Sequence, residues 1–166
     1  MSFTPIRMRR TLDQALATPV FPDGVVLKSF GAPHAKALHD LLQLGYAQGG
    51  GRVAPFPQWW ESLSSDAEYD PALCFTAFGP DGLAGVAQCW SSAFVKDLVV
   101  HPLWRRRGLG TALLLTAFHA LRQRGAGSVA LKVEADNHAA LRFYEIMGLE
   151  RQDGNEKGRG GGPAFS

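Results

Sequence analysis

The fold of this chain is decided by the segment Asp97-Leu98-Val99-Val100-His101-Pro102-Leu103-Trp104-Arg105-Arg106-Arg107-Gly108-Leu109-Gly110-Thr111. It predicts an apolar strand, then a short basic turn, then the start of a long helix. The helix is predicted because apolar residues recur at three- and four-residue spacing and give it one apolar face. These residues are Leu113, Leu114, Ala117, Phe118 and Leu121. Gly125 follows the last turn and is typical of a helix stop.

The turn between this strand and this helix suits a ligand that carries phosphate. A helix N-terminus has backbone N–H groups without acceptors and a positive partial charge. Gly108 and Gly110 have no side chain that would keep a ligand away from that backbone. Arg105, Arg106 and Arg107 add positive charge. The turn lacks the Gly-Lys-Ser/Thr of a P-loop and the third glycine of a dinucleotide fingerprint. The sequence therefore predicts a cradle for a compact ligand with several phosphates.

This turn is similar to the acyl-CoA-binding motif of the GNAT superfamily of N-acetyltransferases, Arg/Gln-x-x-Gly-x-Gly/Ala. Arg105, Gly108 and Gly110 occupy its three specified positions without a gap. The strand before the turn ends in Val-x-Pro and the helix after it is rich in leucine. Both features make the resemblance more specific than the three motif positions alone.

A later segment resembles a second motif of the same family, Asn-x-x-Ala-x-x-x-Tyr-x-x-x-Gly-Phe. Its specified positions are held here by Asn137, Ala140, Tyr144 and Gly148. Leu149 replaces the usual aromatic residue at the end of the motif. The alternating residues 129–133 predict a strand before the motif, and Asn137 is a competent cap for the helix that follows.

The resemblance implies an α/β fold in which a central mixed, mostly antiparallel sheet is flanked by helices. The elements predicted from about residue 24 follow this order: a strand, two helices, three strands, a helix, a strand, a helix, and a final pair of strands that could include 163–166. We therefore expect a GNAT domain over residues 24–166. Residues 1–23 are expected to form an N-terminal extension, with a short helix near 11–17.

The resemblance also implies where acetyl-CoA, the co-substrate, would bind. The backbone of Leu98, Val99 and Val100 is expected to line the pantetheine arm and polarise the thioester. The pyrophosphate is expected on the turn formed by Arg105, Arg106, Arg107, Gly108, Leu109, Gly110 and Thr111. Asn137 has two compatible interpretations, as a helix cap and as a contact to the cofactor.

Transfer of an acetyl group to an amine requires a neutral amine, a stabilised carbonyl oxygen and a protonated leaving thiolate. Tyr144 corresponds to the tyrosine that protonates the departing sulfur in many relatives; the alternative is an aromatic core residue. Asp97 is a candidate general base, directly or through water. Glu134, at the end of the next strand, is an alternative base, and so is a chain of water molecules with no single residue.

Composition narrows the remaining classes of protein. With 166 residues, 46% hydrophobic and 19% charged, the chain resembles a single soluble domain. A net charge of +2, and an arginine run without interleaved aromatics, predict no nucleic-acid partner. Without a spanning segment or a signal core, we expect a cytoplasmic protein, no membrane association and reduced cysteines. The five histidines have no metal-ligand spacing, so no metal is expected.

The acceptor is expected to be a small molecule with a primary amine, because aromatic side chains can bind a cationic amine. The region expected to wall its site contains Tyr46, Arg52, Phe56, Trp59, Trp60 and Glu61. Helix packing is the alternative role for the tryptophans. The competing functions are a protein or peptide N-acetyltransferase and a non-catalytic CoA-binding sensor or interaction module. A homodimer remains open.

Overall fold

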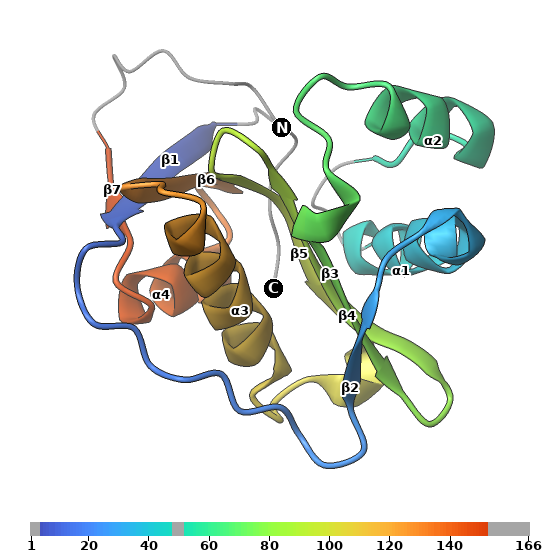
Figure 1. Ribbon diagram of the computed structural model, residues 1–166, viewed down its shortest axis with the longest axis horizontal. Coiled ribbons are helices and arrows are strands. Elements are labelled where there is room, and N and C mark those ends of the chain that lie inside the picture. The colour runs from blue at the N-terminus through green and yellow to red at the C-terminus, as the bar shows by residue number, and fades with distance from the viewer. Residues whose placement is uncertain (1–3, 48–51, 153–166) are drawn as a thin grey trace.

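The computed structural model describes residues 4–47 and 52–152, which form one sheet with helices on both faces (Figure 1). The strands are β1 (Pro5–Thr11), β2 (Val26–Ser29), β3 (Cys74–Gly79), β4 (Gly82–Trp90), β5 (Phe94–Val100), β6 (Ser128–Glu134) and β7 (Glu150–Arg151). The α-helices are α1 (Ala35–Tyr46), α2 (Phe56–Ser64), α3 (Leu109–Gln123) and α4 (His138–Ile146). Three short 3-10 turns are η1 (Ala32–His34), η2 (Pro71–Leu73) and η3 (Pro102–Trp104).

The sheet has the strand order β2-β3-β4-β5-β6-β1-β7. Only the β5–β6 pair is parallel; the other pairs of described strands are antiparallel. One core cluster joins α3 and α4 to one face of the sheet, and a second joins α1 and α2 to the other face. The predicted mixed, mostly antiparallel sheet flanked by helices is therefore confirmed.

The two glycine stops predicted for helices are also present. Gly125 after α3 and Gly148 after α4 have φ values of 90° and 91°. At each stop the next residue donates its N–H back across six residues, from Ala126 to the Leu121 carbonyl and from Leu149 to the Tyr144 carbonyl. This is the left-handed end that satisfies the last helical carbonyls, and glycine adopts it without strain.

The N-terminal segment differs from its prediction. Residues 12–17 contain no helix, and β1 pairs with β6 from Pro5↔Glu134 to Thr11↔Ser128. It also pairs with β7, so it lies inside the sheet and is not an extension before residue 24. Met8 is fully buried, whereas its neighbours Arg7 and Arg9 are half-buried and exposed, respectively. The apolar pattern of β1 is too short to predict a strand from sequence. The strand forms because β6 provides its hydrogen-bonding partner. The expected strand at 163–166 lies outside the described residues.

The parallel pair at the centre of the sheet is incomplete. β5 and β6 pair only at Phe94↔Ala130 and Val95↔Leu131, although β5 continues to Val100. The pairing of β5 with β4 shifts by one residue at the same point, because Gln88 faces Asp97 and Cys89 faces Val95. Lys96 is thus the extra residue of a β-bulge, which bends its strand. Beyond the bulge, the facing edges of β5 and β6 have no ladder partners among the described residues.

Candidate active site

The turn before α3 forms an anion cradle. Gly108 caps the helix with a φ of 81°, and Arg106 also has a left-handed φ, of 63°. The first-turn N–H groups of Leu109, Gly110 and Thr111 have no acceptor within the helix. Alternation of left- and right-handed residues turns successive N–H groups toward one concavity, a geometry that binds anions. The helix dipole adds positive potential at the same place.

A cavity of about 300 Å³ opens at this turn. Its lining residues are Val100, Trp104, Arg105, Arg106, Gly108, Leu109, Gly110, Thr111 and Phe143. A Cβ added to Gly110 would lie 3.6 Å from Val100 Cγ2 and 3.8 Å from Phe143 Cζ, at the wall of the cavity. Added to Gly108, it would meet nothing within 4 Å. Both glycines therefore leave backbone open to a ligand, which fits the pyrophosphate of acetyl-CoA.

The other residues predicted to bind the cofactor have different surroundings. The Arg107 guanidinium lies 4.8 Å from the Trp104 ring centroid and does not line the cavity. Leu98 and Val99 bury their side chains in opposite core clusters, so only their backbone can face the unpaired edge of β5. Asn137 caps α4 by accepting the N–H of Ala140 at 3.2 Å. Its predicted contact with the cofactor stays a prediction.

Sequence reasoning missed two aromatic residues of the cavity wall, Trp104 and Phe143. Trp104 packs so closely on Gly79 that a Cβ there would lie 2.6 Å from the indole ring. Phe143 contacts Tyr144, with ring centroids 5.3 Å apart. The only sequence signal for Phe143 was its position beside the motif tyrosine. Its placement brings the wall of the cradle into contact with the predicted proton donor.

Asp97 lies in a buried polar cluster on the α1 face of the sheet. The hydroxyl of Tyr46, at the end of α1, donates a hydrogen bond to Asp97 Oδ1. The ammonium of Lys96 lies 2.9 Å from Asp97 Oδ2. The Asp97 side chain is only 4% exposed. Consecutive strand residues normally point to opposite faces, and the bulge at Lys96 lets these two share one face.

Tyr144 is fully buried, and its hydroxyl has no hydrogen-bond partner among the described residues. Burial first, and then the negative charge of Asp97, raise the pKa of the Tyr144 phenol. The phenol is therefore neutral at physiological pH and has a proton available for donation. A buried hydroxyl without a partner is costly and marks a functional position or an unfilled contact. The two predicted catalytic residues, from different elements, are thus close enough to interact electrostatically.

A family model described as the acetyltransferase (GNAT) family matches residues 36–149. The chain belongs to this family. Acetyl-CoA is the donor that the family implies, and the cradle, the unpaired β5 edge and the buried tyrosine lie within the matched residues. β1, inside the sheet, lies before them.

The most similar curated relatives include mycothiol acetyltransferases. That of Rhodococcus erythropolis is 32% identical over 88% of this chain and 54% of its own length. That of Nocardia farcinica is 32% identical over 86% and 51%. A GCN5-related N-acetyltransferase from Sphaerobacter thermophilus has a TM-score of 0.76 at 26% identity, covering 89% of this chain and 48% of that one. The chain therefore spans about half the length of these relatives.

The six residues expected to wall the acceptor site differ in their surroundings. Trp59 is buried and packs with His39, at 5.2 Å between ring centroids, and with Phe56. This ring cluster joins α1 to α2, so helix packing explains it. Trp60 is half-buried, and Arg52 and Glu61 are exposed. The sixth predicted wall residue, Tyr46, belongs to the Asp97 cluster.

Glu134, the alternative base, lies at the end of β6. Burial first, and then the nearby Asp136, raise the pKa of its carboxyl. A raised pKa suits a proton acceptor near neutral pH. Nevertheless, the charge that raises the pKa of the Tyr144 phenol is that of Asp97.

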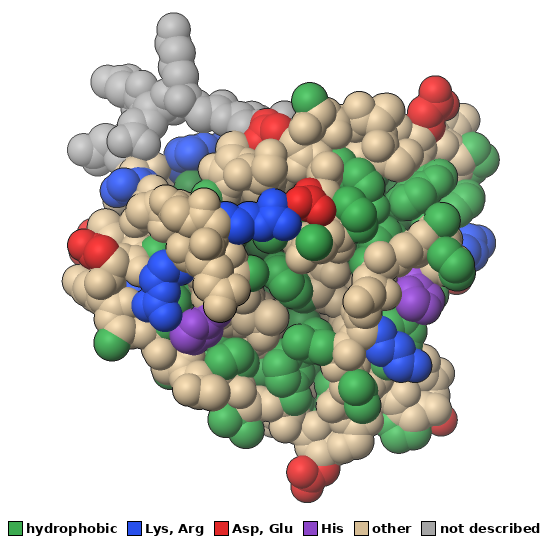
Figure 2. Space-filling model, in the orientation of Figure 1, with side chains coloured by type: hydrophobic (Ala, Val, Ile, Leu, Met, Phe, Trp, Pro, Cys, Tyr) green, Lys and Arg blue, Asp and Glu red, His purple; other side chains and the backbone are tan. Residues whose placement is uncertain are grey.

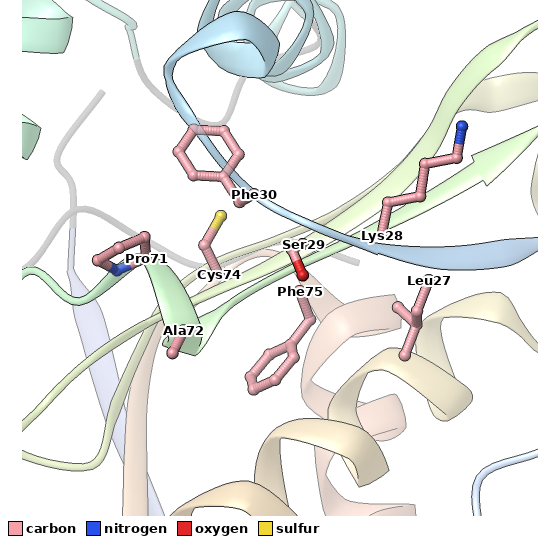
Figure 3. Close-up of a pocket in the computed structure, with 8 residues that line it drawn as sticks. All are labelled: Leu27, Lys28, Ser29, Phe30, Pro71, Ala72, Cys74 and Phe75. Carbon is pink, nitrogen blue, oxygen red and sulfur yellow. The ribbon is translucent and has the colours of Figure 1, made fainter.

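A second cavity, of about 480 Å³, lies between β2, η2 and β3 (Figure 3). It is lined by Leu27, Lys28, Ser29, Phe30, Pro71, Ala72, Cys74 and Phe75. The Cys74 sulfur points toward the Phe30 ring, while the Lys28 ammonium points away. Burial raises the pKa of the Cys74 thiol, so it is not a ready nucleophile. No residue predicted for the acetyltransferase site lines this cavity.

The surface has no concentrated basic field on the face viewed in Figure 2, where lysine and arginine side chains are dispersed. Within residues 4–47 and 52–152, no three His, Cys, Asp or Glu side chains form a group that could hold a metal ion. In the same part of the chain, no helix combines the length and apolar character needed to cross a membrane. Cys74 and Cys89 are buried free thiols.

Proposed function

We propose that this protein transfers the acetyl group of acetyl-CoA to the primary amine of a small molecule. The observation that carries the proposal is the cavity at the N-terminus of α3, with its glycine backbone, free N–H groups and two arginines. Phosphate groups are strongly favoured at such a helix end. The cavity adjoins Val100, the last residue of the unpaired β5 edge, along which an amide-containing arm can form strand-like hydrogen bonds.

The chemistry assigned to the chain's own residues conserves protons. The amine nitrogen forms a bond to the thioester carbonyl carbon, and the carbon–sulfur bond breaks with its electron pair going to sulfur. Asp97 accepts one proton from the attacking nitrogen. Tyr144 donates one proton to the sulfur, so that a neutral amide and a free thiol are the products. Backbone N–H groups of β5 beyond the bulge would stabilise the negative charge on the carbonyl oxygen.

Asp97 is preferred to Glu134 as the base because its charge acts on the Tyr144 phenol, the proposed proton donor. Its carboxylate is also held by the Tyr46 hydroxyl and the Lys96 ammonium. The charge that acts on Glu134 is that of Asp136, near the end of β6.

A small-molecule acceptor is supported by the names of the two curated relatives described above, both mycothiol acetyltransferases. The half-buried Trp60 adds an aromatic surface, in contact with Phe30 and Tyr69 at centroid distances of 6.1 and 6.2 Å. An aromatic face attracts a cationic amine before that amine is deprotonated.

The test is a screen of amines with acetyl-CoA, in which release of free CoA thiol is followed by a thiol reagent and the product by mass spectrometry. Small primary amines, amino acid derivatives and short peptides form separate arms. A product heavier than a small amine by one acetyl group in place of one hydrogen supports the proposal. Turnover confined to peptides would assign the acceptor to proteins instead. Binding of acetyl-CoA without any amide product would indicate a non-catalytic module.

A further inference from the structure

The Asp97 carboxylate has a different partner on each of its two oxygens. The Tyr46 hydroxyl donates a hydrogen bond to Oδ1, and the Lys96 ammonium lies 2.9 Å from Oδ2. Hydrogen bonds to a charged group are stronger than neutral ones and hold the side chain in one rotamer. The carboxylate is therefore fixed in orientation from both sides. Neither Tyr46 nor Lys96 lies in either of the two motifs, Arg105–Gly110 and Asn137–Leu149, that resemble those of the family.

Tyr46 reaches Asp97 because α1 lies unusually close to β5. A Cβ placed on the preceding residue, Gly45, would lie 2.5 Å from Val99 Cγ1. Only glycine permits this approach of the helix to the strand. Tyr46 is the last residue of α1 and is 9% exposed, so its hydroxyl is directed into the protein at the level of Asp97.

The partners of Asp97 are a permanent donor and a cation. Burial first, and then the charge of Asp97, raise the pKa of the Tyr46 phenol well above its usual value. Tyr46 thus keeps its proton and serves as a donor throughout the physiological range. Lys96 is 21% exposed and also lies over the Trp90 ring, at 5.9 Å from its centroid. Cys74, Cys89 and Tyr144 are the other titratable groups on which the charge of Asp97 acts.

We propose that Tyr46 is a positioning residue for acetyl transfer: with Lys96 it fixes the Asp97 carboxylate in one orientation, so that Asp97 accepts the proton of the attacking amine. This inference rests on the proposed function. The proton leaves the amine nitrogen for the Asp97 carboxylate as the bond between nitrogen and the acetyl carbon forms, and Tyr144 gives its own proton to the departing sulfur.

Removal of the Tyr46 hydroxyl takes away the donor to Asp97 Oδ1 and leaves Lys96 as the remaining partner named above. The carboxylate then loses its fixed orientation, and removal of the proton from the attacking amine slows.

The first test compares Tyr46→Phe with Thr116→Val, which removes a hydroxyl whose bond goes to the Ala112 carbonyl within α3. With the best amine from the screen, Tyr46→Phe should lower kcat roughly tenfold or more and leave the KM for acetyl-CoA within about twofold. Thr116→Val should leave kcat and KM unchanged.

A double-mutant cycle shows whether Tyr46 acts through Asp97. In an Asp97→Asn background, Tyr46→Phe should cause less than about a twofold further loss, since the two changes would not be additive. Lys96→Gln, which removes the charge from the other oxygen, should lower kcat in the same direction. Because Lys96 is less buried than Tyr46, Lys96→Gln tests the positioning of Asp97 even if Tyr46→Phe folds poorly. Full additivity, or an unchanged rate in Tyr46→Phe, would overturn the proposal.

A measurement without turnover separates this inference from the proposed function. In protein labelled with ¹³C at aspartate carboxyl carbons, the Asp97 signal is the one lost in Asp97→Asn. Tyr46→Phe should shift that signal at neutral pH, while Thr116→Val should not. An unmoved signal would overturn the Tyr46 contact even if the protein acetylates amines. A shifted signal in a protein that acetylates none of the amines or peptides would refute the assigned reaction, and with it the positioning role.

Discussion

Phe143 and Tyr144 are adjacent in α4, and their ring centroids are 5.3 Å apart, yet one lines the anion cavity and the other is fully buried in the core. A ligand that fills the cavity therefore contacts the neighbour of the candidate proton donor. This relationship connects binding at the α3 turn with chemistry in the centre of the sheet.

Tyr144→Phe should abolish most turnover and leave binding intact. The change keeps the ring and its packing but removes the only proton that the side chain can donate. We expect the rate to fall by roughly a hundredfold, as for a lost general acid, equal to about 3 kcal/mol of barrier. Acetyl-CoA affinity should change little. Because the buried hydroxyl has no partner, the free energy of unfolding should stay the same or increase.

The measurement for Tyr144→Phe combines steady-state kinetics with calorimetric titration of acetyl-CoA and urea unfolding. A normal rate in the folded variant would assign Tyr144 to the core alone. A loss of affinity equal to the loss of rate would indicate a binding role in place of proton donation.

Gly110→Val should weaken acetyl-CoA binding while preserving the fold. A Cβ at Gly110 makes ordinary contacts, 3.6 Å from Val100 and 3.8 Å from Phe143, and the larger side chain would occupy the cavity. We expect Kd to rise about tenfold or more, from lost close approach to the helix N-terminus. Gly127→Ala is the matched control, because nothing lies within 4 Å of its Cβ and its φ is not left-handed.

At Gly108 the expectation is different from that for Gly110. Its φ of 81° strains any L residue, so Gly108→Val should lower stability as well as affinity, by about 1 kcal/mol or more. Equal Kd values for wild type and Gly110→Val would place the pyrophosphate elsewhere.

Acetyl-CoA should raise the thermal midpoint in a concentration-dependent way, because a ligand bound only by the native state stabilises it. At roughly a hundred times Kd the stabilisation is about 2.7 kcal/mol. Desulfo-CoA should act similarly, since it retains the phosphates and the pantetheine amides, whereas ATP and NAD should be markedly weaker. Differential scanning fluorimetry measures all four ligands. Equal shifts for all of them would indicate a general anion site.

Gly45→Ala should destabilise the protein. The added Cβ would lie 2.5 Å from Val99 Cγ1, so α1 must move away from β5. Overpacking of this kind costs about 1–3 kcal/mol, measurable as a lower urea midpoint at unchanged m-value. The Gly127→Ala control should stay near wild type. If Gly45→Ala were neutral, the close approach of α1 to β5 would not exist in solution.

The free energy of unfolding should fall between pH 9 and 12. Burial raises the pKa of the Cys89 thiol from 9.0 to about 12, so the thiol ionises first in the unfolded chain. The free energy of unfolding is not reduced by this ionisation below pH 9. As the pH rises from 9 toward the pKa of the thiol in the folded protein, the free energy of unfolding falls by about 1.4 kcal/mol per pH unit. Urea unfolding at several pH values gives the slope. In Cys89→Ala the free energy of unfolding should depend less steeply on pH, by the contribution of one proton. An identical pH dependence would show that the thiol ionises equally in the folded and unfolded states.

Local features of this protein could be predicted from the sequence. The α3 turn, the cap at Asn137 and the stops at Gly125 and Gly148 depend on neighbouring residues along one stretch of chain, and the structure has each of them in place. The antiparallel β3–β4 pair also follows from alternation and a tight turn. Such features are determined by backbone geometry and hydrogen bonds within a few residues, which a sequence displays directly.

The tertiary structure alone decided the position of β1 between β6 and β7, the stacking of Arg107 on Trp104, and the contact between Tyr46 and Asp97. Tyr46 and Asp97 are 51 residues apart. Their contact depends on two separate local devices, the glycine that lets α1 approach β5 and the bulge that turns Asp97 toward it. The sequence does not show that these two features act together, because packing of the whole core brings the helix and the strand into contact.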